Sequence, residues 1–213
     1  MNFVTLVAFD IETTGLEAEK EDIVEIAGSK FTFERKDGKL VTREIAAFSS
    51  LARPSKLIPD EVIRIHGITN AMVEDAPDIK TVLQQFLRFC GLSPVLVAHN
   101  AAFDSAFIAK AVRKYGMVMP QNPIVDSLKI IRKILPEYAS HKLGEVARKL
   151  GEQTGIALSK GDLHRAAYDC LVLREVLCAC LRKRYQDKDL AMDTAVRSLE
   201  SVHGQVLRFS QFA

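Results

Sequence analysis

Three extended stretches fill the first 50 residues, and helical patterns alternate with short strands after them. The stretches are VTLVAFDIE (4–12), DIVEIAGSKFTFE (22–34) and KLVTREIAAFSSL (39–51), with a KDG turn signal between the last two. Helical periodicity follows in IKTVLQQFLRFC, which Gly91 ends, and in DSAFIAKAVRKY, which Gly116 ends. PVLVAHN and PIVDS have the pattern of short strands. This order favours an α/β fold, a mixed β-sheet of about five strands flanked by helices.

Two further helices and a polar end segment are expected in the second half of the chain. SHKLGEVARKLG predicts a helix with Ser140 as candidate N-cap, and a long helix is predicted over roughly Ala166–Tyr185. Residues 186–213 are more polar, with a helical pattern at Met192–Val202. We therefore expect one domain over residues 1–185 and a C-terminal helical appendage or tail over residues 186–213.

Composition supports a folded domain and excludes several classes of protein. The 213 residues are 48% apolar and 26% charged, which suits one domain with a large core and rules out a disordered chain. Neither a membrane span nor a secretory signal is indicated, so a cytoplasmic location is expected. The cysteines form no CxxC pair and are interpreted as reduced core thiols: Cys90, Cys170, Cys178 and Cys180.

The segment FDIETTGL carries the strongest chemical signal. In a strand, alternate side chains share a face, so Asp10 and Glu12 project together. Two close carboxylates repel each other unless a cation neutralises them, and their oxygens suit Mg²⁺ or Mn²⁺. A solvated strand end is the alternative. The pair ends an apolar strand and precedes a TTG turn, which favours a site.

Two later acidic residues lie at comparable places. Asp104 follows the strand VLVAHN where the chain turns into a helix, and it could equally serve as a helix N-terminal residue. Asp169, in LHRAAYDC, lies on a helix face with Leu173 and Val176. An unpaired carboxylate on a core-facing stripe is costly, so Asp169 should face a cation or a cleft. His164 precedes it by five residues.

In this order, the three segments resemble the motifs of the DnaQ-like 3′–5′ exonucleases of the DEDD superfamily. The resemblance covers about residues 3–182 and includes HGIT at 66–69. The histidine-type branch, DEDDh, has His where this chain has His164, whereas the tyrosine-type branch would need Tyr at the place of Arg165. The resemblance implies an RNase H-like exonuclease fold, similar to the epsilon proofreading subunits of DNA polymerase III.

The resemblance also implies roles for individual residues. It implies two divalent ions, Mg²⁺ or Mn²⁺, held by four carboxylates: Asp10, Glu12, Asp104 and Asp169. It implies that His164 deprotonates the attacking water, with His141 a competitor whose SHKL context looks like a helix start; His99 is expected to be structural. Positions that border the terminal nucleotide in the family are Thr13, Thr14, Leu16, His66, Asn100 and Phe103. For Phe103, a place in the core is the alternative.

The implied activity is hydrolysis of phosphodiester bonds at single-stranded or frayed 3′ ends, with release of nucleoside 5′-monophosphates. DNA proofreading or repair is the first interpretation, and RNA 3′-end trimming of the RNase T or oligoribonuclease type is its rival. A non-catalytic nucleic-acid-binding module is a further alternative, but binding alone needs no general base. Expected partners are DNA or RNA 3′ ends and a DNA polymerase subunit or sliding clamp, since GQVLRF loosely resembles clamp-binding peptides; no membrane is expected.

Overall fold

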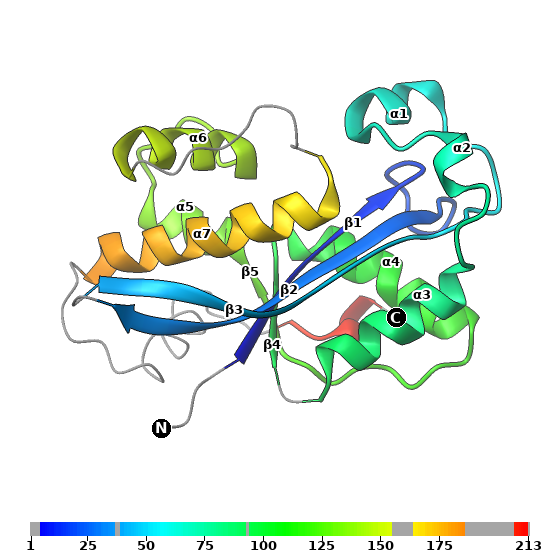
Figure 1. Cartoon of the computed structure of the whole chain (residues 1–213), viewed down its shortest axis with the longest axis horizontal. Coiled ribbons are helices and arrows are strands. Elements are labelled where there is room, and N and C mark those ends of the chain that lie inside the picture. The colour runs from blue at the N-terminus through cyan, green and yellow to red at the C-terminus, as the bar shows by residue number, and fades with distance from the viewer. Residues whose placement is uncertain (1–4, 37–38, 93, 155–163, 186–206, 213) are drawn as a thin grey trace.

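A computed structural model describes residues 5–36, 39–92, 94–154, 164–185 and 207–212. Within these ranges one five-stranded sheet has the order β3-β2-β1-β4-β5 (Figure 1). Its strands are β1 (Thr5–Thr13), β2 (Ile23–Lys36), β3 (Lys39–Leu51), β4 (Val95–Ala98) and β5 (Ile124–Asp126). Strand β2 is antiparallel to both of its neighbours, β1 and β3, whereas β1, β4 and β5 are parallel to one another. The predicted mixed sheet of five strands is confirmed.

Strand β1 occupies the centre of the sheet because both of its faces are apolar. Leu6 and Ala8 pack into one core cluster, and Val7 and Phe9 pack into another on the opposite face. This alternation follows from the two-residue period of a strand. Beyond the apolar run, the register between β1 and β2 shifts between Glu12 and Thr13, where the strand gives way to the TTG turn.

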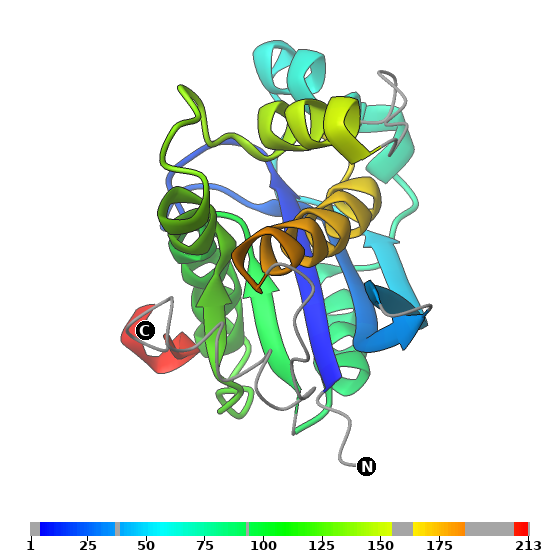
Figure 2. The same cartoon turned by 90° about the vertical axis from the view of Figure 1, so that its left-hand side faces the viewer.

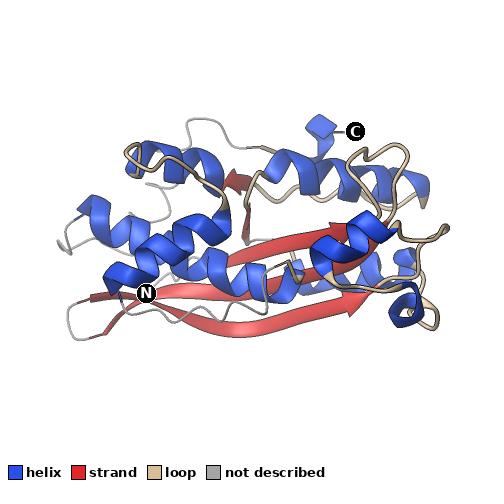
Figure 3. Cartoon of the chain, turned by 90° about the horizontal axis from the view of Figure 1, so that it is seen from above, coloured by secondary structure: helices blue, strands red, loops and turns tan. Residues whose placement is uncertain are grey.

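Helices cover both faces of the sheet, as the three views show (Figures 1, 2 and 3). One face packs against α7, which in turn contacts α5 and α6, whereas the other packs against α3 and α4. Two short helices, α1 and α2, lie beyond the end of β1 (Figure 1). The helices are α1 (Asp60–His66), α2 (Asn70–Val73), α3 (Ile79–Cys90), α4 (Ala101–Lys114), α5 (Ser127–Ile134), α6 (Leu143–Thr154) and α7 (Ala166–Tyr185), with a 3₁₀ turn η1 (Phe209–Phe212).

Two helices begin at different places from those expected. The helix predicted from about Asp104 begins at Ala101, because Asn100 takes a left-handed conformation (φ 66°) and serves as its N-cap. The helix predicted around Ser140 begins at Leu143, and the Ser140 hydroxyl makes only a long 3.4 Å hydrogen bond with the Lys142 N–H. The predicted helix at residues 192–202 lies outside the described ranges.

The last described residues pack back onto the domain. Leu207 and Ile124 exchange backbone hydrogen bonds of 2.9 and 3.0 Å, so this segment continues the sheet beyond β5. Phe209 is fully buried, with its ring centroid 6.3 Å from that of Phe9. In Figure 2 the C-terminal turn, in red, lies beside β5 and α4. Leu207 and Phe209 of the GQVLRF peptide therefore pack against the core of their own domain, and the domain boundary at residue 185 stays a prediction.

The thiols follow the sequence-based interpretation. All four cysteines are buried and form no disulfide: Cys90, Cys170, Cys178 and Cys180. Among the described helices, none is both long enough and apolar enough to cross a bilayer.

Candidate active site

Three of the four predicted carboxylates meet where β1 and α7 approach each other. Asp10 and Glu12 project from the end of β1 on one face, and Asp169 projects from the first turns of α7. One oxygen atom from each of these three side chains lies within 4.8 Å of the others. Within the described part of the chain, this is the group of side chains suited to hold a metal ion.

Asp104 reaches the same region from the other side of β1. Strand β4 pairs with β1 only as far as Ala8, so the N–H of Ile11 lies beyond the reach of β4. That N–H donates instead to the Asp104 carboxylate at 3.2 Å. Asp104 is almost fully buried in the first turn of α4, and its charge raises the pKa of Asp10.

Burial raises the pKa values of all four acids, and repulsion from nearby carboxylates adds to each shift. Burial, followed by the charge of Asp104, holds the pKa of Asp10 well above its ordinary value. Burial and then the charge of Asp169 raise the pKa of Glu12 to about 9. Burial raises the pKa of Asp104 to about 8 and that of Asp169 to about 6. Clustered carboxylate oxygens of this kind fit hard divalent cations such as Mg²⁺ and Mn²⁺, which would remove the repulsion.

His164 stands beside this cluster with an exposed side chain. Its backbone is left-handed (φ 68°), an uncommon conformation for a residue with a Cβ. Its charge and its backbone N–H both lower the pKa of Asp169, against the effect of burial. Two other histidines are engaged elsewhere: Nε2 of His141, the competing candidate, lies 2.9 Å from the Leu135 carbonyl oxygen, and Nδ1 of His99, expected to be structural, lies 2.9 Å from the Ser127 hydroxyl.

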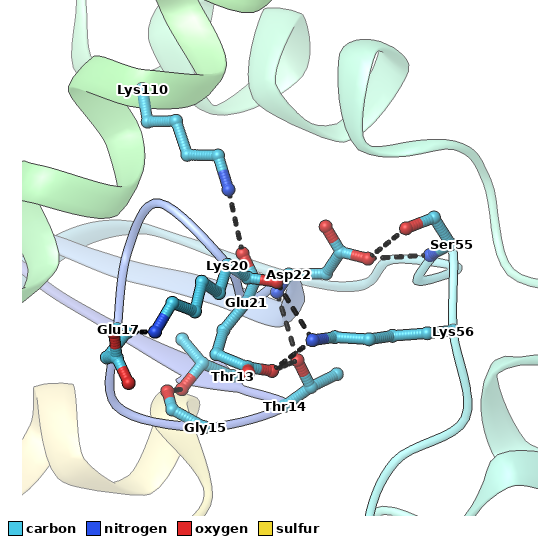
Figure 4. Close-up of polar contacts among 10 residues, drawn as sticks. All are labelled: Thr13, Thr14, Gly15, Glu17, Lys20, Glu21, Asp22, Ser55, Lys56 and Lys110. Atoms are coloured by element: carbon cyan, nitrogen blue, oxygen red, sulfur yellow. Dashed lines mark hydrogen bonds and ion pairs between the residues drawn. The ribbon is translucent and has the colours of Figure 1, made fainter.

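The TTG turn after β1 is stabilised by its own side chains (Figure 4). The Thr13 hydroxyl donates to the Gly15 carbonyl at 2.6 Å, and the Thr14 hydroxyl donates to Glu21 at 2.5 Å while accepting from the Asp22 N–H at 3.0 Å. Lys56 pairs with the same Glu21 carboxylate at 2.7 Å. A Cβ on Gly15 would lie 2.9 Å from the Glu21 side chain. Both threonine hydroxyls therefore shape the turn, and their predicted contact with a nucleotide stays a prediction.

The other predicted nucleotide-binding residues differ in accessibility. Leu16 is 84% exposed at the turn, and the side chain of Asn100 is also exposed. His66 is buried at the end of α1, where its Nδ1 accepts from the Ile68 N–H at 3.0 Å. Phe103 is half-buried, with its ring centroid 5.0 Å from that of Phe107. Leu16 and Asn100 thus present accessible surfaces, whereas His66 and Phe103 are partly or wholly packed.

The family model for RNase T, described as an exonuclease, matches residues 7–177. The chain belongs to this exonuclease family. The match includes all four carboxylates and His164, so the geometric cluster lies inside the region that defines the family.

Named relatives agree with this assignment. The chain is 32% identical to the DNA polymerase III subunit epsilon of Aquifex aeolicus over 84% of its own length and 81% of that protein. It is 37% identical to the PolC-type DNA polymerase III of Bacillus cereus over 78% of its length, and 36% identical to that of Clostridium perfringens over 86%. The chain spans only 10% and 12% of those two PolC-type proteins.

Solved structures show the same fold. An exonuclease X in complex with 5′ overhanging duplex DNA aligns with a TM-score of 0.62 and 25% identity, covering 91% of this chain and 99% of that one. A full-length 3′-exonuclease aligns with a TM-score of 0.68 at 15% identity, covering 86% of this chain and 62% of that one. The exonuclease fold expected from the motifs is confirmed.

The sequence motifs assign no role in the site to two residues that lie beside it in this exonuclease. Glu25 pairs across the sheet with Glu12, and its side chain is only 1% exposed. Arg165, directly after His164, binds the Glu25 carboxylate through two nitrogens. The available signal was a single acid inside the apolar stretch IVEIAG, but its partner lies 140 residues away in the chain.

Proposed function

We propose that this chain is a divalent-metal-dependent 3′–5′ exonuclease domain acting on single-stranded or frayed 3′ ends of DNA. It releases nucleoside 5′-monophosphates and serves proofreading during replication. The observation that carries the proposal is the convergence of Asp10, Glu12 and Asp169 within 4.8 Å, with Asp104 and His164 beside them. A binding module has no need of this combination of acids and a candidate base.

The side chains divide the chemistry between them. Asp10, Glu12, Asp104 and Asp169 would hold two ions; when bound, the ions supply positive charge at the scissile phosphate and make the attacking water more acidic. His164 would accept the water proton on an imidazole nitrogen, since histidine changes charge near neutral pH. Its exposed ring beside Asp169 suits this role.

The epsilon relative supports DNA proofreading as the biological role. That protein is named as a DNA polymerase III subunit, and the chain covers most of it. We therefore propose a DNA polymerase as partner and the cytoplasm as location. Phe209 is fully buried in the domain and Leu207 bonds to β5, so these two residues of GQVLRF are engaged within the domain and are not available to a sliding clamp.

The test is an assay on a 5′-labelled single-stranded oligodeoxynucleotide, with an RNA of the same sequence in parallel. Mg²⁺ or Mn²⁺ should support shortening one nucleotide at a time, and excess chelator should abolish it. Ca²⁺ should support binding with little turnover, because its coordination is longer and looser. Asp10→Ala is the inactive control.

Three outcomes would change the proposal. Full activity in chelator would remove the metal from the mechanism. Cleavage of a closed circular single strand would show an endonuclease. Faster shortening of RNA than of DNA would assign the chain to RNA 3′-end trimming.

A further inference from the structure

Glu25 is a buried acid next to a cluster that already holds too much negative charge. It lies on β2 directly opposite Glu12, and its charge raises the pKa values of Glu12, Asp10 and Asp169. A buried carboxylate in such a place is costly unless it is paired and hydrogen-bonded. Its contacts therefore indicate what it contributes.

Those contacts all lead to the start of α7. Arg165 donates to the Glu25 carboxylate from Nη2 at 2.8 Å and from Nε at 3.2 Å, a two-pronged pairing that fixes the guanidinium plane. The N–H of Ala166, the first residue of α7, donates to the same carboxylate at 3.1 Å. Glu25 thus caps α7 from a neighbouring strand, where a negative charge also complements the helix dipole.

The anchored backbone carries both site residues contributed by this segment. His164 immediately precedes Arg165 and has a left-handed backbone, which is disfavoured for a residue with a Cβ. Asp169 is attached to Arg165 as well, since the backbone N–H of Asp169 donates to the Arg165 carbonyl at 3.0 Å. The position of both side chains relative to β1 therefore depends on the attachment of Arg165 and Ala166 to Glu25.

We propose that Glu25 and Arg165 form a positioning pair that fixes His164 and Asp169 against the carboxylates of β1. This inference rests on the proposed exonuclease activity. Neither residue reacts with the substrate; each acts through the backbone at the start of α7. The alternative is that Arg165, whose side chain is 42% exposed, binds a substrate phosphate itself.

A double-mutant cycle separates the two roles. We expect Glu25→Gln and Arg165→Gln each to lower kcat by about 10–100-fold, the scale of a misplacement of about 1 Å, with KM for the oligonucleotide within about twofold of wild type. The double variant should be no slower than the slower single variant, because both changes break one pairing. Arg165→Lys, which keeps the charge and loses the fork, should be as slow as Arg165→Gln.

A matched control is available on the same helix. Arg174 of α7 bonds to Glu44 of β3 at 2.6 Å, another ion pair between helix and sheet but away from the carboxylates. Glu44→Gln should leave kcat unchanged. Hydrogen–deuterium exchange of the metal-free proteins should be faster over residues 166–169 in Glu25→Gln and unchanged there in Glu44→Gln.

The outcomes that overturn the pair are specific. Wild-type kcat in Glu25→Gln, or unchanged exchange over residues 166–169, would show that the pair does not position the site. A raised KM in Arg165→Gln with unchanged kcat and additive effects in the double variant would assign Arg165 to substrate binding. Failure of the exonuclease proposal looks different, because wild type would then show no metal-dependent turnover to compare. If Glu25→Gln does not fold, Arg165→Lys and Arg165→Gln test the same pairing, because they change its more exposed member.

Discussion

At the residue scale, buried acids in this exonuclease fall into two groups. Glu25 is matched by Arg165 and a helix N–H, so its charge is compensated within the chain. Asp10 and Glu12 have raised pKa values because they are buried and because their neighbours are also acids. Repulsion within the second group lowers the stability of the metal-free protein, and the same negative charge attracts cations to the site.

Removing one of these acids should abolish turnover and stabilise the metal-free protein. In Asp10→Asn, the amide keeps the shape of the side chain and removes one charge from the cluster. We expect its Tm in chelator at pH 8 to rise above that of wild type, by about 2–4 °C for each kcal/mol of repulsion removed. Thermal unfolding in chelator checks this.

The control for that measurement should shift in the opposite direction. Asp78 caps α3 by accepting from the Thr81 N–H at 2.9 Å, and that bond lowers its pKa. Asp78→Ala should therefore lower the Tm. An unchanged or lower Tm in Asp10→Asn would contradict the repulsion described above.

Replacing His164 should affect the chemical step more than binding. We expect His164→Gln to lower turnover by about 10²–10⁴-fold, the usual range for a lost general base, while oligonucleotide affinity measured with Ca²⁺ stays close to wild type. His141→Gln is the comparison, since His141 is bonded to the Leu135 carbonyl and should keep full turnover. The reverse result would make His141 the base.

At the element scale, the C-terminal turn behaves as part of the domain. Phe209 is fully buried beside Phe9, so Phe209→Ala should lower the free energy of unfolding by about 3–5 kcal/mol, as for other large-to-small core changes. Chemical denaturation measures this loss. Ser210→Ala, at an exposed neighbour, should have little effect, and a stable Phe209→Ala variant would mean that the turn is dispensable.

Elements defined by local pattern were predictable, whereas those that depend on distant contacts were not. Gly91 and Gly116 end their helices with positive φ, as their positions after apolar periodicity indicated. The earlier start of α4 depends on Asn100, whose N–H donates to Asp126 at 3.0 Å from a different strand. Phe209 could not be assigned to the core from its short, polar surroundings in the sequence, because the residues that it packs against, Phe9 among them, lie far away in the chain.

The residues of the candidate site differ in the same way in how far the sequence predicts them. Asp10 and Glu12 could be placed together from strand alternation alone, since a two-residue period leaves no other choice. Glu25 could not, because its role depends on a strand register and on a partner in α7.

At the scale of the whole molecule, the acidic cluster should make stability depend on pH and on divalent ions. The folded pKa of Glu12, about 9, lies above its ordinary value of 4.5, so between these pH values the folded protein binds more protons than the unfolded one. The free energy of unfolding in chelator should therefore fall as pH rises through this window. Saturating Mg²⁺ should raise the Tm because it binds only the folded state, and the rise should be largest at the alkaline end, where fewer protons compete for the carboxylates.

Thermal scans across that pH range, with chelator or Mg²⁺, measure the effect. Glu12→Gln should flatten the dependence in chelator. If the free energy of unfolding of the wild type in chelator rose steadily with pH, then ionisation of these carboxylates would not destabilise the folded protein.

The contact between Phe9 and Phe209 also determines when the domain can finish folding during synthesis. Strand β1 leaves the ribosome first, but the ring that fills the space beside Phe9 is made 200 residues later. Contacts between such distant residues form late, because a long loop must close before they contribute. The nascent chain can thus assemble the sheet and α3 and α4 around an unfilled space, and the domain is complete only after translation has passed residue 209.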